Sequence, residues 1–160
     1  MPKTNAISLL KQDHEKVKSL FDQFEKAKDS AKKKKIADEA IMELKVHATV
    51  EEEIFYPKVR AELEDDENLM NEAQEEHHVA KVLIAELEKR DVIDEVFEAK
   101  FIVLAENVRH HIKEEEGEMF PEVKKLDIDL EALGEEMTQR KEELQIEGVP
   151  ASPEEAMVGK

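Results

Sequence analysis

The sequence predicts an all-α fold, an up-down-up-down antiparallel four-helix bundle with a short extra C-terminal helix and a tail. Three observations lead to this prediction. The 160 residues are 41% charged and only 4% aromatic, a composition that favours long helices with a solvent-facing side. The four glycines and five prolines are too few for a sandwich or barrel of many short strands. Apolar residues recur at steps of three and four along most of the chain, which is the spacing of an amphipathic helix.

The chain length fits one domain, which we predict over residues 1–145, followed by a flexible tail at 146–160. A chain of 160 residues can bury one core but is too short for two comfortable domains. The C-terminal sequence GVPASPEEAMVGK contains Gly148, Pro150 and Pro153 and needs no fold of its own.

The first predicted helix pair is joined by a turn at Lys28–Ser30. The buried stripe of its first helix consists of Leu10, His14, Val17, Phe21 and Phe24. The stripe of its second helix consists of Ile36, Ala40, Leu44, His47, Glu51 and Ile54. Pro57 has no backbone N–H to donate, so we expect the second helix to kink or end near it. His14, His47 and Glu51 therefore lie where apolar residues are expected.

The second helix pair repeats this arrangement. Connections are predicted at Glu64–Asn68 and Asp91–Asp94. The third stripe consists of Leu69, Ala73, His77, Ala80, Ile84 and Leu87, and the fourth of Phe97, Phe101, Leu104, Val108, His111 and Glu115. A shorter fifth helix from about Asp129 to Leu144 is expected to pack on the outside of the bundle.

Two matching segments indicate that the helix pair is duplicated. HATVEEEIFYP runs from His47 to Pro57 and HIKEEEGEMFP from His111 to Pro121. In an antiparallel pair, residues equally far from the turn lie at the same height, because each helix rises evenly along its axis. By this rule the four histidines and two glutamates of the stripes converge at one level of the core. Buried carboxylates need a positive partner, so the convergence predicts a metal site.

The predicted ligands are imidazole nitrogens and carboxylate oxygens without sulfur, a set that suits iron, manganese or zinc. Two bridging carboxylates favour two metal ions, each with two histidines and a share of both glutamates. Each ion is then short of six ligands, which leaves room for a bridging oxygen and a small exogenous molecule.

The motif pattern resembles that of the hemerythrin-like HHE cation-binding family over about residues 5–126. The residues that carry the resemblance are His14, His47, Glu51, His77, His111 and Glu115. The resemblance implies a four-helix bundle that holds two iron ions as an oxo- or hydroxo-bridged non-heme di-iron centre. It implies these six residues as ligands, with Glu51 and Glu115 bridging. Such centres bind oxygen, nitric oxide or peroxide, or report on iron and oxygen supply.

Two departures from the family limit what the resemblance implies. The oxygen-carrying members have a fifth histidine where this sequence has Lys81, so reversible oxygen carriage is not implied. Members linked to iron–sulfur cluster repair have a cysteine-bearing N-terminal segment, and this chain has no cysteine.

Five further residues have predicted positions. Tyr56 lies nine residues after His47 and would point away from the site on an ideal helix, but Pro57 bends the backbone nearby. We therefore predict Tyr56 as a candidate additional ligand, as phenolate or as a hydrogen-bond donor. Glu43 and Asn107 lie one turn before two of the histidines and are predicted to orient those imidazoles. His78 and His110 are expected to face solvent.

The leading functional hypothesis is a non-heme di-iron protein that binds a small oxidant and reduces or disproportionates it. The oxidant is dioxygen, hydrogen peroxide or nitric oxide, and whether the protein is an enzyme of peroxidase, catalase or nitric-oxide-detoxifying type stays open. One alternative is an iron or oxygen sensor, or an iron reservoir, without catalysis. Another is a structural zinc or manganese site.

Charge and composition exclude some classes of partner. The net charge of −17 argues against a nucleic acid or an anionic membrane. No segment approaches the roughly 18 apolar residues of a membrane span, and the N-terminus has no apolar core of signal-peptide length. The lack of cysteine fits a reducing compartment. We therefore expect a cytoplasmic protein whose ligand is a small diatomic molecule or peroxide, and the sequence does not identify a protein partner.

Overall fold

The structure is a computed structural model that describes residues 5–63, 67–90 and 93–158. Every regular element in these ranges is a helix. The predicted connection at Glu64–Asn68 falls mostly outside the described residues, and so do the first residues of Asp91–Asp94. The predicted turn at Lys28–Ser30 is confirmed, because one helix ends at Lys26 and the next begins at Ser30.

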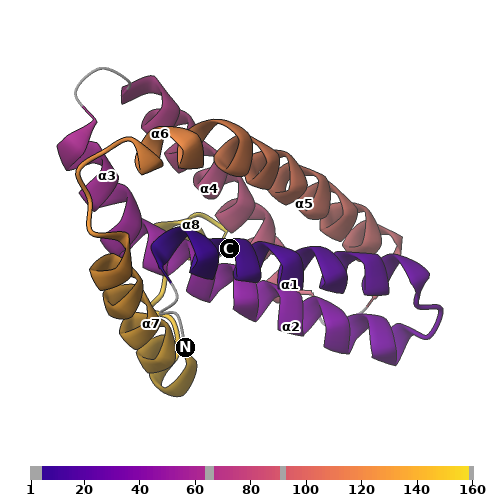
Figure 1. Ribbon diagram of the computed structural model, residues 1–160. Coiled ribbons are helices and arrows are strands. Elements are labelled where there is room, and N and C mark those ends of the chain that lie inside the picture. Colours follow the sequence, from indigo (N-terminus) through magenta and orange to yellow (C-terminus); the bar gives the residue numbers. More distant parts are fainter. Residues whose placement is uncertain (1–4, 64–66, 91–92, 159–160) are drawn as a thin grey trace.

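Four long helical rods form the predicted bundle (Figure 1). The first rod is α1, Ala6–Lys26, and the third is α4, Glu67–Glu88. The second rod runs through α2, Ser30–Val50, a π-helical turn η1, Glu51–Phe55, and α3, Tyr56–Glu62. The fourth runs through α5, Glu95–Glu114, a π-helical turn η2, Glu115–Met119, and α6, Phe120–Lys124. Helix α1 packs along α2 and α4 along α5, which is the duplicated pair of the sequence.

The two π-helical turns lie at the same place in each repeat. The Tyr56 N–H donates to the carbonyl of Glu51, and the Phe120 N–H donates to the carbonyl of Glu115. In both repeats a proline follows directly, and its missing N–H removes a regular hydrogen bond of the α-helix. The second rod therefore passes Pro57 through a widened turn, so the irregularity predicted there takes the form of a π turn and α3 continues beyond it.

Short polar side chains begin several of these helices. Asn5 accepts a hydrogen bond from the backbone of Ser8 at the start of α1, and Asp29 accepts one from Lys32 at the start of α2. Asp94 accepts a hydrogen bond from the backbone N–H of Phe97 at the start of α5. Such caps satisfy N–H groups that have no partner within the helix, so they define where each rod starts.

Two helices lie outside the bundle. The predicted fifth helix is confirmed as α7, Leu130–Glu147, which crosses the end of the α1/α2 pair (Figure 1). Within the range predicted as a flexible tail, Pro153–Met157 forms a short helix, α8, that lies against α4. Ser152 caps α8 by accepting a hydrogen bond from the Glu155 N–H.

The apolar interior consists of two clusters, one towards each end of the bundle. One cluster includes Leu10, Phe55 and Val59 together with Met137 of α7. The other includes Phe21, Phe24, Phe97 and Phe101 near the turn between α1 and α2. Buried polar residues occupy the level between the two clusters, so apolar packing on both sides holds that level in place.

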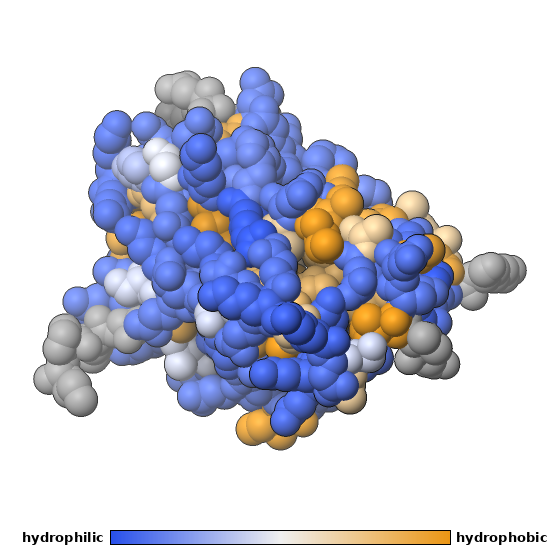
Figure 2. All heavy atoms as spheres, turned by 90° about the vertical axis from the view of Figure 1, so that its right-hand side faces the viewer, coloured by the Kyte–Doolittle hydropathy of each residue, from blue (hydrophilic) through white to orange (hydrophobic). Residues whose placement is uncertain are grey.

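The surface is mainly hydrophilic, as the acidic composition requires. Figure 2 shows one end of the molecule, where hydrophilic side chains predominate and apolar atoms gather mostly to the right of the centre. None of the helices in the described ranges is both long enough and apolar enough to cross a membrane.

Candidate metal centre

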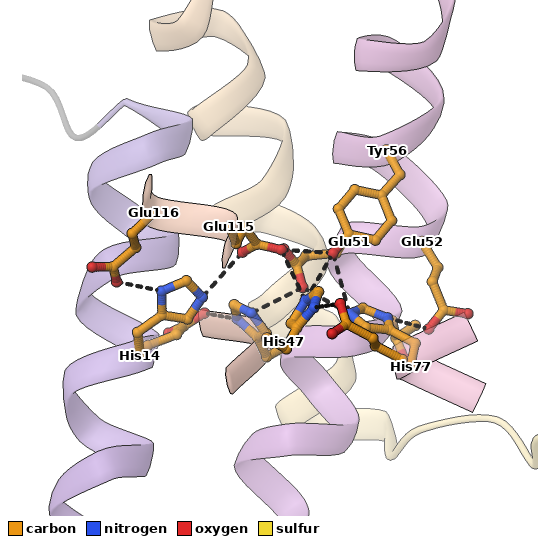
Figure 3. A network of polar contacts seen from close by, with 12 residues as sticks. His14, His47, Glu51, Glu52, Tyr56, His77, Glu115 and Glu116 are labelled. Atoms are coloured by element: carbon orange, nitrogen blue, oxygen red, sulfur yellow. Dashed lines mark hydrogen bonds and ion pairs between the residues drawn. The ribbon is translucent and has the colours of Figure 1, made fainter. Parts of the chain in front are cut away.

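The structure brings the six predicted ligand residues together at the polar level of the bundle. They are His14 on α1, His47 on α2, Glu51 in η1, His77 on α4, His111 on α5 and Glu115 in η2. Their exposed fractions range from 0% for Glu51 to 9% for His111. Figure 3 shows the side chains of His14, His47, Glu51, His77 and Glu115 pointing towards one another, as the matched helical spacing predicts.

The ligand atoms fall into two groups, each with atoms within 4.8 Å of one another. Cluster 1 is His14, His47 and Glu115, and cluster 2 is Glu51, His77 and His111. Each glutamate also reaches across to the other cluster. Glu51 Oε1 lies 3.0 Å from His47 Nε2 and 3.2 Å from His77 Nε2. Glu115 lies 3.1 Å from His14 Nε2 and 3.0 Å from His111 Nε2, so both carboxylates stand between the clusters.

Several buried atoms at this level have no hydrogen-bond partner among the described residues. They are His14 Nε2, His47 Nε2, both carboxylate oxygens of Glu51, and Glu115 Oε1. These atoms approach one another closely, but not in hydrogen-bonding geometry. An unsatisfied buried polar group costs about 1–3 kcal/mol, more if it is charged. Metal ions accept lone pairs from imidazole nitrogen and carboxylate oxygen alike, so the donor set fits metal ions held between the clusters.

Each imidazole is held through its other ring nitrogen by a carboxylate. The four pairs are His14 Nδ1 with Glu116 at 2.6 Å, His47 Nδ1 with Asp13 at 2.9 Å, His77 Nδ1 with Glu52 at 2.9 Å, and His111 Nδ1 with Glu76 at 2.8 Å. We call these the outer carboxylates. A carboxylate that accepts the Nδ1–H fixes the tautomer in which Nε2 is an unprotonated donor to a metal.

The outer carboxylates follow the internal repeat. Asp13 and Glu76 each directly precede a ligand histidine, and each holds the histidine of the other helix in its own pair. Glu52 and Glu116 each directly follow a ligand glutamate, and each holds a histidine of the opposite pair. These four residues were not predicted from the sequence, although acidic residues at matching positions in both repeats are a signal that could have identified them.

Two lysines support the outer carboxylates from further out. Lys141 of α7 donates to Asp13 at 2.5 Å, and Lys81 of α4 donates to Glu52 at 2.5 Å. Lys81 occupies the position where a fifth histidine would stand in an oxygen carrier. In this structure its ammonium group instead fixes the carboxylate that orients His77.

Of the residues predicted to orient the imidazoles, neither is the observed partner. The Nδ1 of His47 faces Asp13 on α1 and not Glu43. Glu43 instead accepts a hydrogen bond from Lys16 at 2.8 Å. Asn107 lines the cavity described below, whereas the Nδ1 of His111 faces Glu76 on α4. One-turn spacing identified residues on the same helix, but the partners lie on neighbouring helices.

The two histidines expected to face solvent behave differently. His110 is 64% exposed and lies 2.8 Å from Glu114. His78 is only partly exposed, because its Nδ1 lies 2.6 Å from Glu154 of α8. The C-terminal segment therefore covers part of α4 next to the site.

Without a metal, the carboxylates draw protons onto the imidazoles. Burial favours neutral histidine, but the charge of Glu51 and the hydrogen bond to Asp13 raise the pKa of His47 well above its usual value. Against the same effect of burial, hydrogen bonds to Glu115 and Glu76 raise the pKa of His111 to about 10. Burial opposes ionisation of Glu115, yet the close approach of the His111 and His14 imidazoles holds its pKa well below the usual range. Protons thus supply the positive charge that a metal would supply.

Tyr56 reaches the centre. Its hydroxyl donates to Glu115 Oε2 at 2.6 Å and lies 3.2 Å from the Nε2 atoms of His77 and His111 (Figure 3). Burial, and then the charges of Glu115 and Glu51, hold the pKa of this phenol well above its ordinary value. In the other repeat the matching residue is Phe120, whose ring stacks on His14 with centroids 6.0 Å apart. The two repeats therefore differ at this position, because Tyr56 brings a hydroxyl to Glu115, His77 and His111 whereas the side chain of Phe120 carries none.

A cavity of about 240 Å³ opens on this polar level. Its polar end is formed by Asp13 and the four ligand histidines. Its walls come from α2, α4 and α5, and residues 149–153 and Glu155 of the C-terminal segment complete them. A small molecule in this cavity would lie next to both clusters.

Fold and site together define a class of protein, a four-helix bundle with buried histidine and glutamate clusters able to hold metal cations. The chain belongs to the hemerythrin HHE cation binding domain family, whose model matches residues 5–123.

Two known proteins are similar to the chain. One is a hemerythrin HHE cation binding domain-containing protein of Mycobacterium kansasii, whose crystal structure superimposes with a TM-score of 0.73 at 28% sequence identity. That match covers 90% of this chain and 94% of the other. The second is a DNA nickase of Nostoc sp. (strain PCC 7120 / SAG 25.82 / UTEX 2576), 26% identical over 120 residues, or 75% of this chain. The matched part is 34% of the nickase, so the chain spans about a third of that relative's length.

Proposed function

We propose that the chain is a non-heme di-iron protein that binds a small oxidant and reduces or disproportionates it. The observation that carries the proposal is the pair of matched clusters with both glutamates between them. In this proposal His14 and His47 hold one iron, His77 and His111 hold the other, and Glu51 and Glu115 bridge them. A pair of iron ions would supply the electrons with which dioxygen, hydrogen peroxide or nitric oxide is reduced.

The residues around the clusters have separate roles in this proposal. The outer carboxylates hold each imidazole with its Nε2 towards the metal position. The two apolar clusters above and below exclude water from the level of the site. Tyr56 lies against cluster 2, where it either donates its hydroxyl proton or binds iron as phenolate.

Partner and location are part of the same proposal. We include no nucleic-acid partner, because a net charge of −17 would repel the phosphate backbone. We place the protein in the cytoplasm, since a chain without cysteine suits a reducing compartment.

The test starts with the metal content of protein purified without chelators. We expect about two irons per chain and a near-ultraviolet and visible spectrum that changes when azide is added. Iron-loaded protein should consume hydrogen peroxide, and His47→Ala and Glu51→Ala should lose both iron and turnover. His110→Ala is the matched control, because His110 is an exposed histidine beside a proposed ligand. Bound zinc, or iron that neither reacts nor binds azide, would contradict the proposal.

A second function, an iron or oxygen sensor or reservoir without catalysis, is favoured by the unsatisfied atoms of the site. Because His14 Nε2, His47 Nε2, both carboxylate oxygens of Glu51 and Glu115 Oε1 lack hydrogen-bond partners among the described residues, metal binding and folding should be coupled. A sensor predicts that metal removal loosens the fold without any turnover of oxidant. Limited proteolysis with and without metal distinguishes this function, and identical digestion patterns would exclude it.

A further inference from the structure

The cavity beside the clusters is larger and more apolar than a diatomic molecule or hydrogen peroxide needs. We propose that it binds an organic hydroperoxide, with the peroxide group at the polar end and a small alkyl or aryl body between the helices. This inference rests on the proposed function and names the substrate class of the same site.

Apolar side chains form much of the wall away from the clusters. They include Val17 of α1, Leu44 of α2, Ala80 and Ile84 of α4, and Val108 and Ile112 of α5. Such walls bind an apolar body through the hydrophobic effect and offer it no hydrogen bond. The four histidines and Asp13 form the polar end next to the clusters, while Lys45, Lys81 and Glu88 are among the polar residues that also line the cavity. A ligand that fits this lining has one polar end and an apolar remainder.

Small side chains create the space. Helices α2 and α4 face each other across the cavity with Ala48 and Thr49 on one side and Ala80 and Ala85 on the other. These short side chains leave the gap between the helices unfilled. The C-terminal segment covers the gap with Val149, Pro150, Ala151 and Pro153.

Three contacts hold the cover in place. Glu154 pairs with His78 of α4 at 2.6 Å, and Glu155 lies 3.5 Å from Lys45 of α2. Lys89 donates to the carbonyl of Val158 at 2.5 Å. The cover therefore bridges both helices that form the gap, and it adds apolar surface over a bound ligand.

The volume sets the size of the ligand. An engineered apolar cavity of about 150 Å³ binds benzene. At about 240 Å³, this cavity has room for a six-membered ring with a short branched substituent. Cumene hydroperoxide is a molecule of this size and shape.

The reaction balances as a two-electron reduction. The O–O bond breaks, one oxygen leaves as the alcohol ROH and the other as water, and two protons are consumed. A pair of ferrous ions held as in the proposed function would supply the two electrons and would be oxidised to ferric ions. An external one-electron reductant such as ascorbate returns them to the ferrous state.

Binding is measured first, without turnover. The probe is 2-phenyl-2-propanol, the alcohol product of cumene hydroperoxide, titrated calorimetrically into the full-length metal-loaded protein. We expect saturable binding of one molecule per chain. Ala80→Leu on α4 and Ala48→Leu on α2 each fill the cavity from one wall, so each should weaken binding about tenfold or more. Ala99→Leu on the exposed side of α5 is the matched control and should bind as the unmodified protein does.

Kinetics with two peroxides gives the second measurement. Ala80→Leu should raise KM for cumene hydroperoxide about tenfold while KM for hydrogen peroxide stays within about twofold, because only the larger substrate needs the cavity. Absence of saturable alcohol binding, or equal loss for both peroxides, would overturn the inference. If the metal proves inert towards every peroxide while the alcohol still binds and Ala48→Leu weakens it, the proposed function fails and the apolar site remains.

Discussion

At the scale of single residues, the outer carboxylates decide how strongly the histidines can hold a metal. Each accepts the Nδ1–H of one of the four buried histidines, and each carboxylate lies on a different rod of the bundle from its histidine. Removing the negative charge leaves the imidazole weakly oriented and less basic. These residues therefore offer a test of the centre that leaves the ligands themselves intact.

Glu76→Gln should lower the affinity for metal by about 10- to 100-fold, because an amide orients His111 less firmly than the carboxylate does. Competition with a chromophoric chelator measures the change. The matched control is Glu75→Gln, which alters the exposed neighbour on the same helix. Equal affinities of the two variants would mean that the hydrogen bond to His111 does not matter for metal binding.

Tyr56→Phe tests whether the Tyr56 phenolate binds iron. If the phenolate binds iron, the iron-loaded protein has a broad long-wavelength absorption band that disappears in Tyr56→Phe while two irons remain bound. The reason is the position of the hydroxyl, 3.2 Å from the Nε2 atoms of His77 and His111. An unchanged spectrum would leave Tyr56 as a hydrogen-bond donor to Glu115 only.

The convergence of the six predicted ligands could be predicted from the sequence because it depends on helical period and turn positions alone. His47 and Glu51 lie one turn apart on one helix, and the same spacing recurs at His111 and Glu115, so their common height follows from the turn positions. The partner of each Nδ1 depends instead on how neighbouring helices pack. Glu43 was therefore predicted wrongly as the partner of His47, and Asp13 was not found.

At the scale of elements, the π-helical turns explain why Tyr56 reaches the site. On a regular α-helix, nine residues after His47 is the opposite face. The widened turn Glu51–Phe55 rotates the residues beyond it, so Tyr56 faces the clusters. Pro57 indicated an irregularity at this place but not its type. A kink, a helix end and a π turn can each accommodate a residue without a backbone N–H. The matching turn Glu115–Met119 shows that the irregularity belongs to the repeat.

The C-terminal segment is the second element whose position depends on tertiary contacts. Its composition predicts a flexible tail. The segment has no periodic apolar stripe that would indicate packing against α4. The contacts that hold it, Glu154 with His78 and Lys89 with the Val158 carbonyl, join residues far apart in sequence. Helical period cannot reveal such pairs, so the covering role of residues 149–157 emerges only from the structure.

His78→Gln should loosen this cover. Loss of the pair with Glu154 leaves a carboxylate that is only 8% exposed without its partner imidazole, which disfavours the docked position of α8. Hydrogen exchange at residues 149–157 should become faster, whereas the metal content should stay the same. His110→Gln, which changes an exposed histidine next to His111 on α5, is the control and should leave exchange of this segment unchanged. Slow exchange in both variants would show that α8 is held by its other contacts.

At the scale of the whole molecule, the buried polar level links metal binding to folding. The structure separates two apolar clusters by a layer of carboxylates and imidazoles, several of them unsatisfied. Such a layer weakens the core unless positive charge occupies it. Either metal ions or protons on the imidazoles can supply that charge. In the metal-free protein the supply of protons depends on pH.

The metal-free protein should lose stability as pH rises above neutrality. Hydrogen bonds to carboxylates raise the pKa of His111 to about 10 and that of His77 above its usual value, against the opposing effect of burial. A raised pKa in the folded state stabilises the fold fully below the unfolded value of about 6.5, and this stabilisation is lost as pH rises through the folded value. Urea unfolding between pH 6.5 and 9.5 should therefore give a falling free energy for the metal-free protein. Metal-loaded protein is the control: its imidazole Nε2 atoms are occupied, so its stability should be higher and nearly independent of pH over this range. A metal-free protein with a flat profile would mean that protons do not replace the metal charge in the core, and the coupling between site and fold would then have to reside elsewhere.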